Sequence, residues 1–137
     1  MTRMIFVNLP VADLPASMAF YEALGFTNNP QFTDATAACM VWSESIYVML
    51  LTHAKWRGFT DRAIPPSTSS EVSLALALDS REAVDAMLAA AAAHGGTADI
   101  NPAQDMDFMY GRDLTDPDGH VWGPFWMDMA AMPANAA

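Results

Sequence analysis

The chain has 137 residues, of which 53% are hydrophobic and 16% charged, and its formal net charge at pH 7 is −10. This balance excludes a disordered chain, which needs low hydrophobicity, and the negative charge makes nucleic acid a poor partner because phosphates would be repelled. The longest strongly apolar run, residues 86–93, is too short to cross a bilayer, so we expect no membrane partner.

The charge is distributed unevenly along the chain. Residues 1–69 hold 4 basic and 5 acidic residues, whereas residues 70–137 hold 2 basic and 11 acidic residues. The acidic half predicts either a solvated surface or a field that attracts a cationic small molecule. The single cysteine, Cys39, excludes an intrachain disulfide and favours a cytoplasmic location, and its apolar surroundings predict a buried side chain. The N-terminus has no secretory pattern, so we expect an unprocessed protein.

The first half predicts one strand, one helix and three more strands. Residues 4–9 alternate, with Phe6 and Asn8 on one face, and Pro10 is expected to end this strand. Asp13 predicts the N-cap of a helix over residues 14–24 that Gly25 ends. The further predicted strands cover residues 26–32, 37–42 and 46–52.

The second half repeats this order after a long predicted loop over residues 53–70. A strand over residues 71–78 precedes a helix over residues 81–94, capped by Asp79 or Ser80 and ended by two glycines. Three further strands are predicted over residues 97–101, 108–115 and 120–128, and a frayed tail over residues 132–137. The order βαβββ, loop, βαβββ predicts an α+β fold in which two modules, residues 4–52 and 71–128, form a single domain with the helices outside paired sheets.

Two motifs within this order carry a resemblance to a known family. The sequence FYEALGF at residues 20–26 closes the first helix, and DPDG at residues 116–119 forms the turn of the last hairpin. Together with the βαβββ repeat, they resemble the vicinal oxygen chelate superfamily, the glyoxalase, bleomycin-resistance and extradiol-dioxygenase group. The resemblance implies a cupped, mostly antiparallel sheet around a cavity, and a homodimer.

In metal-dependent members of that superfamily, residues on the first and last strands of each module bind one divalent metal. The resemblance places these positions at Phe6, at Tyr47 or Met49, at Glu71 or Ser73, and at Gly123. Glu71 is the only plausible metal ligand among them, since Phe, Met and Gly offer a hard cation no oxygen or nitrogen donor. We therefore expect no metal cofactor. The alternative is a shifted ligand set that holds zinc, nickel, iron or manganese, with Glu71, Asn8 and His53 or His120 converging.

An apolar pocket with a few polar anchors is the remaining candidate site. Aromatic and sulfur-containing side chains fall on the predicted strands, and Trp56 lies in the predicted loop, where it could close over a pocket as a lid. Asp105 is a further candidate anchor. The predicted ligand-binding residues are Phe6, Asn8, Tyr47, Met49, Trp56, Glu71, Tyr110 and Trp122.

These features support three hypotheses about function. The first is a protein that binds a small organic molecule, aromatic or cationic, in the cup without metal chemistry. The second is a metal-dependent lyase or dioxygenase of the glyoxalase type. The third is a non-catalytic interaction module whose sheet edge pairs with a partner. The sequence does not identify the ligand or any catalytic residue.

Overall fold

The computed structural model describes residues 2–131, so the predicted tail over residues 132–137 lies outside the described residues. The N-terminal module contains β1 (Ile5–Val11), α1 (Leu14–Leu24), β2 (Thr27–Asn29), the 3₁₀ turn η1 (Pro30–Phe32), β3 (Ala37–Val41) and β4 (Ile46–Thr52). The short helix α2 (His53–Phe59) follows directly.

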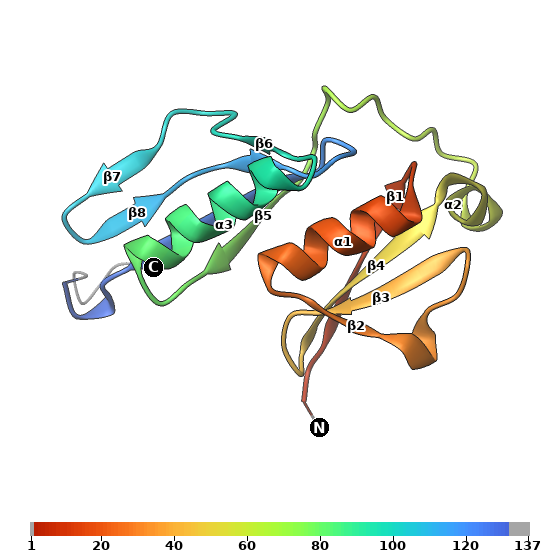
Figure 1. Ribbon diagram of the computed structural model, residues 1–137, viewed down its shortest axis with the longest axis horizontal. Helices are drawn as coiled ribbons and strands as arrows, with labels where there is room; N and C mark the ends of the chain where they lie inside the picture. The colour runs from red at the N-terminus through yellow and green to blue at the C-terminus, as the bar shows by residue number, and fades with distance from the viewer. Residues whose placement is uncertain (1, 132–137) are drawn as a thin grey trace.

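The C-terminal module contains β5 (Ser73–Ala77), α3 (Arg81–Ala93), β6 (Thr97–Ala98), β7 (Gln104–Met106), β8 (Met109–Gly111), β9 (Leu114–Thr115) and β10 (Val121–Met127), followed by the 3₁₀ turn η2 (Met129–Ala131). Figure 1 shows the two modules side by side, joined by the segment that leaves α2 and enters β5. The predicted α+β fold with two βαβββ modules is confirmed.

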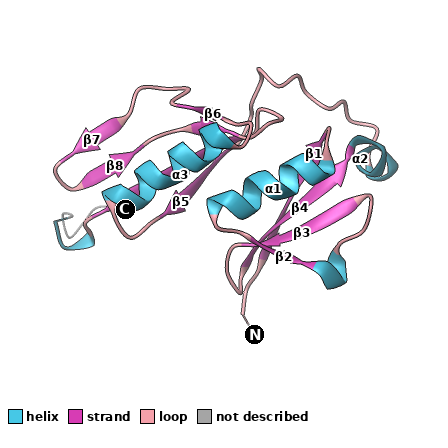
Figure 2. Ribbon diagram, in the orientation of Figure 1, coloured by secondary structure: helices cyan, strands magenta, loops and turns pink. Residues whose placement is uncertain are grey.

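Each module has its own sheet. The first has the order β1-β4-β3-β2, with β1 parallel to β4 and the other pairs antiparallel. In the second sheet β5 runs parallel to β10, and β10 also pairs antiparallel with β8 and β9. Figure 2 shows α1 and α3 side by side on the near side of the strands, so both helices cover the same side of the molecule and leave the other face of each sheet open.

The predicted helices begin at capping residues that the sequence predicts, and α1 also ends at one. The Asp13 side chain accepts a hydrogen bond from the Ala16 backbone N–H, and Gly25 ends α1 with φ 113°, a conformation that favours glycine. Ser80, one of the two predicted caps, accepts from the Ala83 backbone N–H at the start of α3. These local signals explain why the helix boundaries could be predicted from the sequence.

Four predictions about the elements were wrong in detail. The predicted strand over residues 26–32 ends at Asn29, and Pro30–Phe32 form the 3₁₀ turn η1. Pro10 does not end β1, because the strand continues to Val11 alongside β4. Residues 53–59 form α2 rather than loop, and the Thr52 side chain caps this helix by accepting from the Lys55 backbone N–H. The predicted strand over residues 108–115 is split into β8 and β9, and β7, which pairs with β8, was not predicted.

The hydrophobic core joins the two modules. Tyr21 of α1 and Trp122 of β10 are both buried, with ring centroids 5.8 Å apart. The Trp122 Nε1–H donates to the Tyr21 hydroxyl at 2.9 Å, and that hydroxyl donates to the buried Asp116 carboxylate at 2.6 Å. Burial raises the pKa of Asp116 and that of Tyr21 above their usual values.

The DPDG turn fastens the C-terminal module to the start of α1. One Asp118 oxygen accepts from the Ala12 backbone N–H at 2.8 Å, and the other accepts from the Ser17 hydroxyl at 3.4 Å. The His120 Nε2 lies 2.7 Å from the Pro10 carbonyl oxygen. These bonds fix how the two sheets lie relative to each other.

Candidate functional site

The open face of the N-terminal sheet carries a cavity with a volume of about 700 Å³. Strands β1 and β4 form its floor through Asn8, Met49 and Leu51, while α2 and the η1 segment form its walls. The apolar wall residues are Phe32, Ala37, Trp56 and Phe59. This is a concave, mostly apolar site with a few polar groups at its margin, the usual character of a small-molecule site.

The polar groups at the margin are Gln31, Thr33, Asp34, Lys55 and Thr60. Asp34 is held in its loop, where one carboxylate oxygen accepts from the Thr36 N–H and hydroxyl, both at 2.7 Å, and from the Ala37 N–H at 3.0 Å. These bonds to Thr36 lower the pKa of Asp34. The Lys55 ammonium lies 5.5 Å from the centroid of the Phe59 ring, a cation–π distance.

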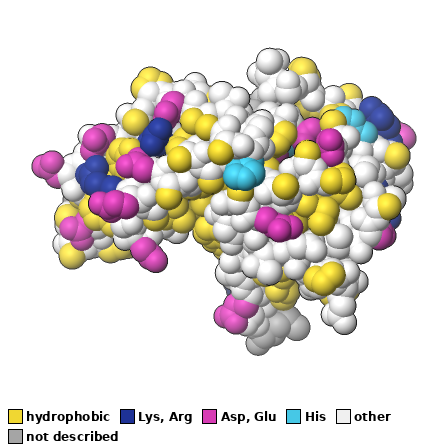
Figure 3. All heavy atoms as spheres, in the orientation of Figure 1, with side chains coloured by type: hydrophobic (Ala, Val, Ile, Leu, Met, Phe, Trp, Pro, Cys, Tyr) yellow, Lys and Arg dark blue, Asp and Glu magenta, His cyan; other side chains and the backbone are white. Residues whose placement is uncertain are grey.

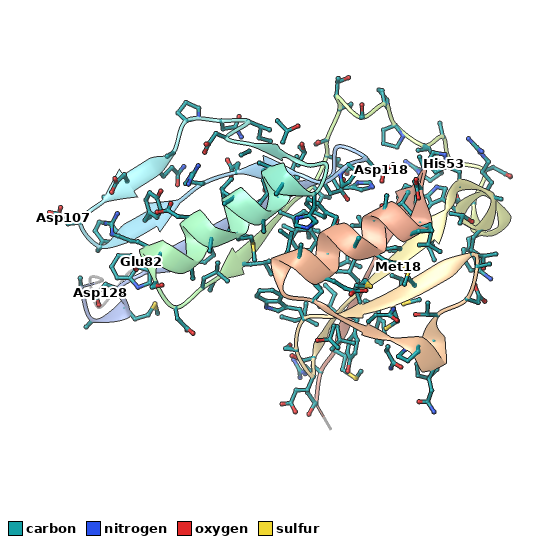
Figure 4. The ribbon with its side chains drawn as sticks, viewed as in Figure 1. Met18, His53, Glu82, Asp107, Asp118 and Asp128 are labelled. Carbon is teal, nitrogen blue, oxygen red and sulfur yellow. The ribbon has the colours of Figure 1, made fainter. Side chains whose placement is uncertain are left out.

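A second cavity of about 370 Å³ lies between the modules. Asn8 reaches this cavity too, and the walls include His53, Glu71, Asp118 and His120. Figure 4 shows Asp118 above the start of α1 and His53 at the start of α2, which mark two sides of this cavity.

The predicted ligand residues separate into three groups. The first group lines the cavities: Asn8, Met49 and Trp56 meet at the larger one, and Glu71 lines the one between the modules. The second group is Phe6 and Tyr47, which stack on the same open face with centroids 4.5 Å apart, but neither lines a cavity described above.

The third group, Tyr110 and Trp122, lies on the helix side of the second sheet. The Tyr110 hydroxyl donates to Asp85 of α3, which raises the pKa of Tyr110, and Trp122 belongs to the core. Asp105, another expected anchor, pairs with Arg81 at 2.7 Å. Tyr110 and Trp122 face α3 rather than the open side of the sheet, because neighbouring residues on a strand point to opposite sides of the sheet.

The cavity residues that the sequence reasoning missed are Phe32, Lys55 and Phe59. The sequence places Phe32 in a predicted strand and Lys55 and Phe59 in a predicted loop, so it does not indicate that all three line one cavity. Trp56 and Phe59 are three residues apart, and Thr52 precedes Lys55 by three, a spacing typical of a capped helix. That pattern could have revealed α2.

The positions to which the resemblance assigns metal ligands carry few donor side chains. Phe6, Met49 and Gly123 supply no oxygen or nitrogen side-chain donor, and Glu71 lies outside β5, whose first residue is Ser73. Within residues 2–131, no three His, Cys, Asp or Glu side chains lie together in a way that could hold a metal ion.

A carboxylate does stand beside one of these positions. A Cβ atom added to Gly123 would lie 2.8 Å from Asp113 Oδ1, so Asp113 occupies the space that a longer side chain on β10 would need. The other Asp113 oxygen accepts from Asn101 Nδ2 at 3.0 Å. Together with Ser73 and Phe125, Asp113 lines a hollow of about 140 Å³ on the open face of the second sheet.

Comparisons with known proteins agree with this architecture. The model of a family described as "Bleomycin resistance protein-like N-terminal" matches residues 3–43. A glyoxalase-related enzyme from Fulvimarina pelagi has 19% identity and a TM-score of 0.78, with 100% of this chain and 96% of that chain covered. The chain has the vicinal oxygen chelate fold. The predicted resemblance to that superfamily is thereby confirmed.

Two further solved structures share this vicinal oxygen chelate fold. A glyoxalase/bleomycin resistance protein from Albidiferax ferrireducens T118 has 26% identity and a TM-score of 0.67, covering 88% of this chain and 95% of that chain. The fosfomycin resistance protein FosX from Mesorhizobium loti has 13% identity and a TM-score of 0.63, covering 95% and 93%. No curated protein matches the chain. No helix within the described residues has the length and hydrophobicity to cross a membrane.

Proposed function

We propose that the protein binds a small organic molecule in the cavity on the open face of its N-terminal sheet, without metal chemistry at the superfamily's metal position. The observation that carries this proposal is the meeting of Asn8, Met49 and Trp56 at one cavity of about 700 Å³, from three different elements. Removing flat apolar surface from water would supply the main favourable term, at roughly 25 cal/mol per Å² buried.

Metal-dependent lyase or dioxygenase activity is the weaker candidate. Such chemistry needs several preorganised donors. The superfamily's positions carry Phe6, Tyr47 or Met49, Glu71 or Ser73, and Gly123, among which Glu71 is the one plausible ligand. We therefore favour binding or sequestration over metal catalysis. The single cysteine favours the cytoplasm as the location.

We also propose that the protein is a homodimer in which the exposed apolar residues at the start of β1 are covered. The side chains of Met4, Ile5 and Phe6 are 51%, 56% and 49% exposed, which is unusual for large apolar residues on a strand and its approach. Sedimentation at micromolar concentration should therefore show a species of twice the 14.8 kDa chain mass. A monomer at that concentration would contradict the dimer and leave the cavity, which one chain forms, unaffected.

The binding proposal can be tested with a cavity-filling variant and a matched control. Ala37 lines the cavity, whereas Ala77 lies exposed on β5 of the other module, away from the cavity. In equilibrium dialysis, 2-ethylnaphthalene should bind to the wild type and to Ala77→Phe, and Ala37→Phe should lose at least tenfold in affinity. Absence of binding to the wild type, or full retention by a folded Ala37→Phe, would overturn the proposal.

A further inference from the structure

The indole N–H of Trp56 has no hydrogen-bond partner. Within residues 2–131, Trp56 Nε1 is the one side-chain nitrogen or oxygen that is shielded from water and unpaired in this way. Trp122 provides the contrast, because its buried Nε1–H donates to the Tyr21 hydroxyl. A buried donor without a partner destabilises the folded state, so its persistence calls for a reason.

Two acceptor oxygens that line the same cavity are already engaged in other hydrogen bonds. The Thr33 hydroxyl oxygen accepts from Asn28 Nδ2 at 2.9 Å and from the Cys39 N–H at 3.1 Å. The Asp34 oxygen described above accepts three bonds from its own loop. These two oxygens are therefore not available to the Trp56 N–H, and a molecule bound in the cavity can supply the missing acceptor.

The helix that carries Trp56 is loosely held. None of the seven residues of α2 is buried, and the helix packs mainly against β4 and β1. Figure 1 shows α2 at the outer end of the N-terminal module, followed by the segment that crosses to β5. A short element with few buried contacts opens at low cost in free energy, so a small shift of α2 or a turn of the indole can bring the N–H to the cavity.

From these observations we propose that the ligand is a flat apolar molecule bearing an acceptor oxygen, of the ketone or carboxylate kind, and that the Trp56 N–H donates to this oxygen when α2 closes. This inference rests on the proposed function and adds the ligand class to it. Lys55, the preceding residue, places a positive charge on the same helix. At this cavity the Lys55 ammonium and the Asp34 carboxylate offset each other, so the flat apolar shape and the acceptor oxygen define the ligand class, and net charge does not.

Two probes of nearly equal shape test this ligand class. In equilibrium dialysis against wild-type protein, 2-acetylnaphthalene should bind about two- to tenfold more tightly than 2-ethylnaphthalene, the range that one neutral hydrogen bond provides. Trp56→Phe keeps an aromatic ring and removes the N–H, so the preference should fall to about onefold. Trp42→Phe is the matched control, since Trp42 packs against Phe26 outside the cavity and should leave the preference unchanged.

Each outcome distinguishes this inference from the proposal beneath it. Equal binding of the two probes to the wild type, or a preference that survives in Trp56→Phe, overturns the acceptor class while the cavity remains a binding site. Failure of both probes to bind overturns the proposed function and this inference together. Because the readout is a ratio of affinities on one folded protein, a general loss of stability in Trp56→Phe does not imitate the expected result.

Discussion

The two modules share one order of elements but differ in strand length and in charge. In the N-terminal module β3 and β4 have five and seven residues and are almost entirely apolar. In the C-terminal module β10 takes the place of β4 and also has seven residues, but the strands between α3 and β10 are short pieces, β6 to β9, of two or three residues each. Asp, Gly and Pro interrupt that half of the sequence, and these residues are depleted from regular strands.

The acidic excess of the C-terminal module is organised around two arginines. Arg112 pairs with Asp85 at 2.9 Å and with Asp99 at 2.7 Å, and Arg81 pairs with Asp105. The Arg81 guanidinium also lies 5.1 Å from the ring centroids of Tyr110 and Trp126. Figure 3 shows acidic side chains gathered with these basic groups on the left of the molecule, where the C-terminal module lies. The comparison teaches that one half offers an apolar cavity while the other carries a polar surface network.

The shared core limits how far the two modules can behave independently. Trp122→Ala would leave a void between them and should lower the free energy of unfolding by about 3–5 kcal/mol. Urea unfolding followed by circular dichroism and fluorescence should show one transition for both modules. Trp126→Ala, at a partly buried position of the C-terminal module, is the control and should cost less. Two separate transitions in the wild type would show that the modules are independent units.

Two tyrosines, Tyr21 at the junction between the modules and Tyr110 in the surface network, allow the stability of these two regions to be compared. Tyr21→Phe would leave the buried Asp116 carboxylate and the Trp122 N–H each without the bond they make to the hydroxyl, at a cost of about 1–3 kcal/mol. Tyr110→Phe removes a hydroxyl that donates to the exposed Asp85, and water can replace it. Chemical denaturation should therefore show a clearly larger loss for Tyr21→Phe, and equal losses would contradict the assigned difference in burial.

How much could be predicted from the sequence follows the same division between local and distant signals. The helix boundaries depend on Asp13, Gly25 and Ser80, each acting on backbone within a few residues, and they were predicted closely. The positions of Tyr110 and Trp122 depend on which sheet face meets α3, and that register involves residues far apart in the chain. The two arginine clusters escaped prediction because the partners of Arg112 come from α3 and from the segment after β6.

Among the candidate site residues, the strand alternation in residues 4–9 correctly placed Asn8 on an exposed face. The replacement of a side chain at Gly123 by Asp113 was not predictable, because the two residues approach each other only through the pairing of neighbouring strands. Sequence spacing therefore predicts the order of helices and strands. The cavity depends on how α2 and η1 fold over the sheet, which the spacing does not indicate.

The looseness of α2 can be tested with a glycine. Nothing lies within 4 Å of a Cβ atom added to Gly58, so Gly58→Ala should stabilise the protein by about 0.4–1 kcal/mol, by lowering the entropy of the unfolded chain. Thermal unfolding measures this gain. Gly119→Ala is the opposite control, since its φ is 88° and an added Cβ would collide with the Ser67 backbone, so this variant should be destabilised. A destabilised Gly58→Ala would contradict the open surroundings of α2.

The smallest expected effect concerns pH and the surface network. Hydrogen bonds from Tyr110 and Arg112 lower the pKa of Asp85, and the hydrogen bond from Arg112 lowers that of Asp99. For a carboxyl whose folded-state pKa is lowered, the stabilisation is present above the unfolded-state pKa of about 3.9 and is lost as pH falls through the lowered value. Arg112→Met should therefore cost about 0.2–1 kcal/mol at pH 7, the range for exposed ion pairs, and less as pH falls below about 4.

Urea unfolding of Arg112→Met and wild type at pH 7, 4 and 3 measures this convergence. The buried Asp116 acts in the opposite direction, because its raised pKa makes the folded state bind a proton more readily, so its contribution to stability grows as pH falls. Asp116 belongs to the junction between the modules and is present in both proteins, so its effect cancels in the difference between them. A difference that stays constant from pH 7 to pH 3 would show that Arg112 stabilises the C-terminal module by packing its side chain rather than by charge.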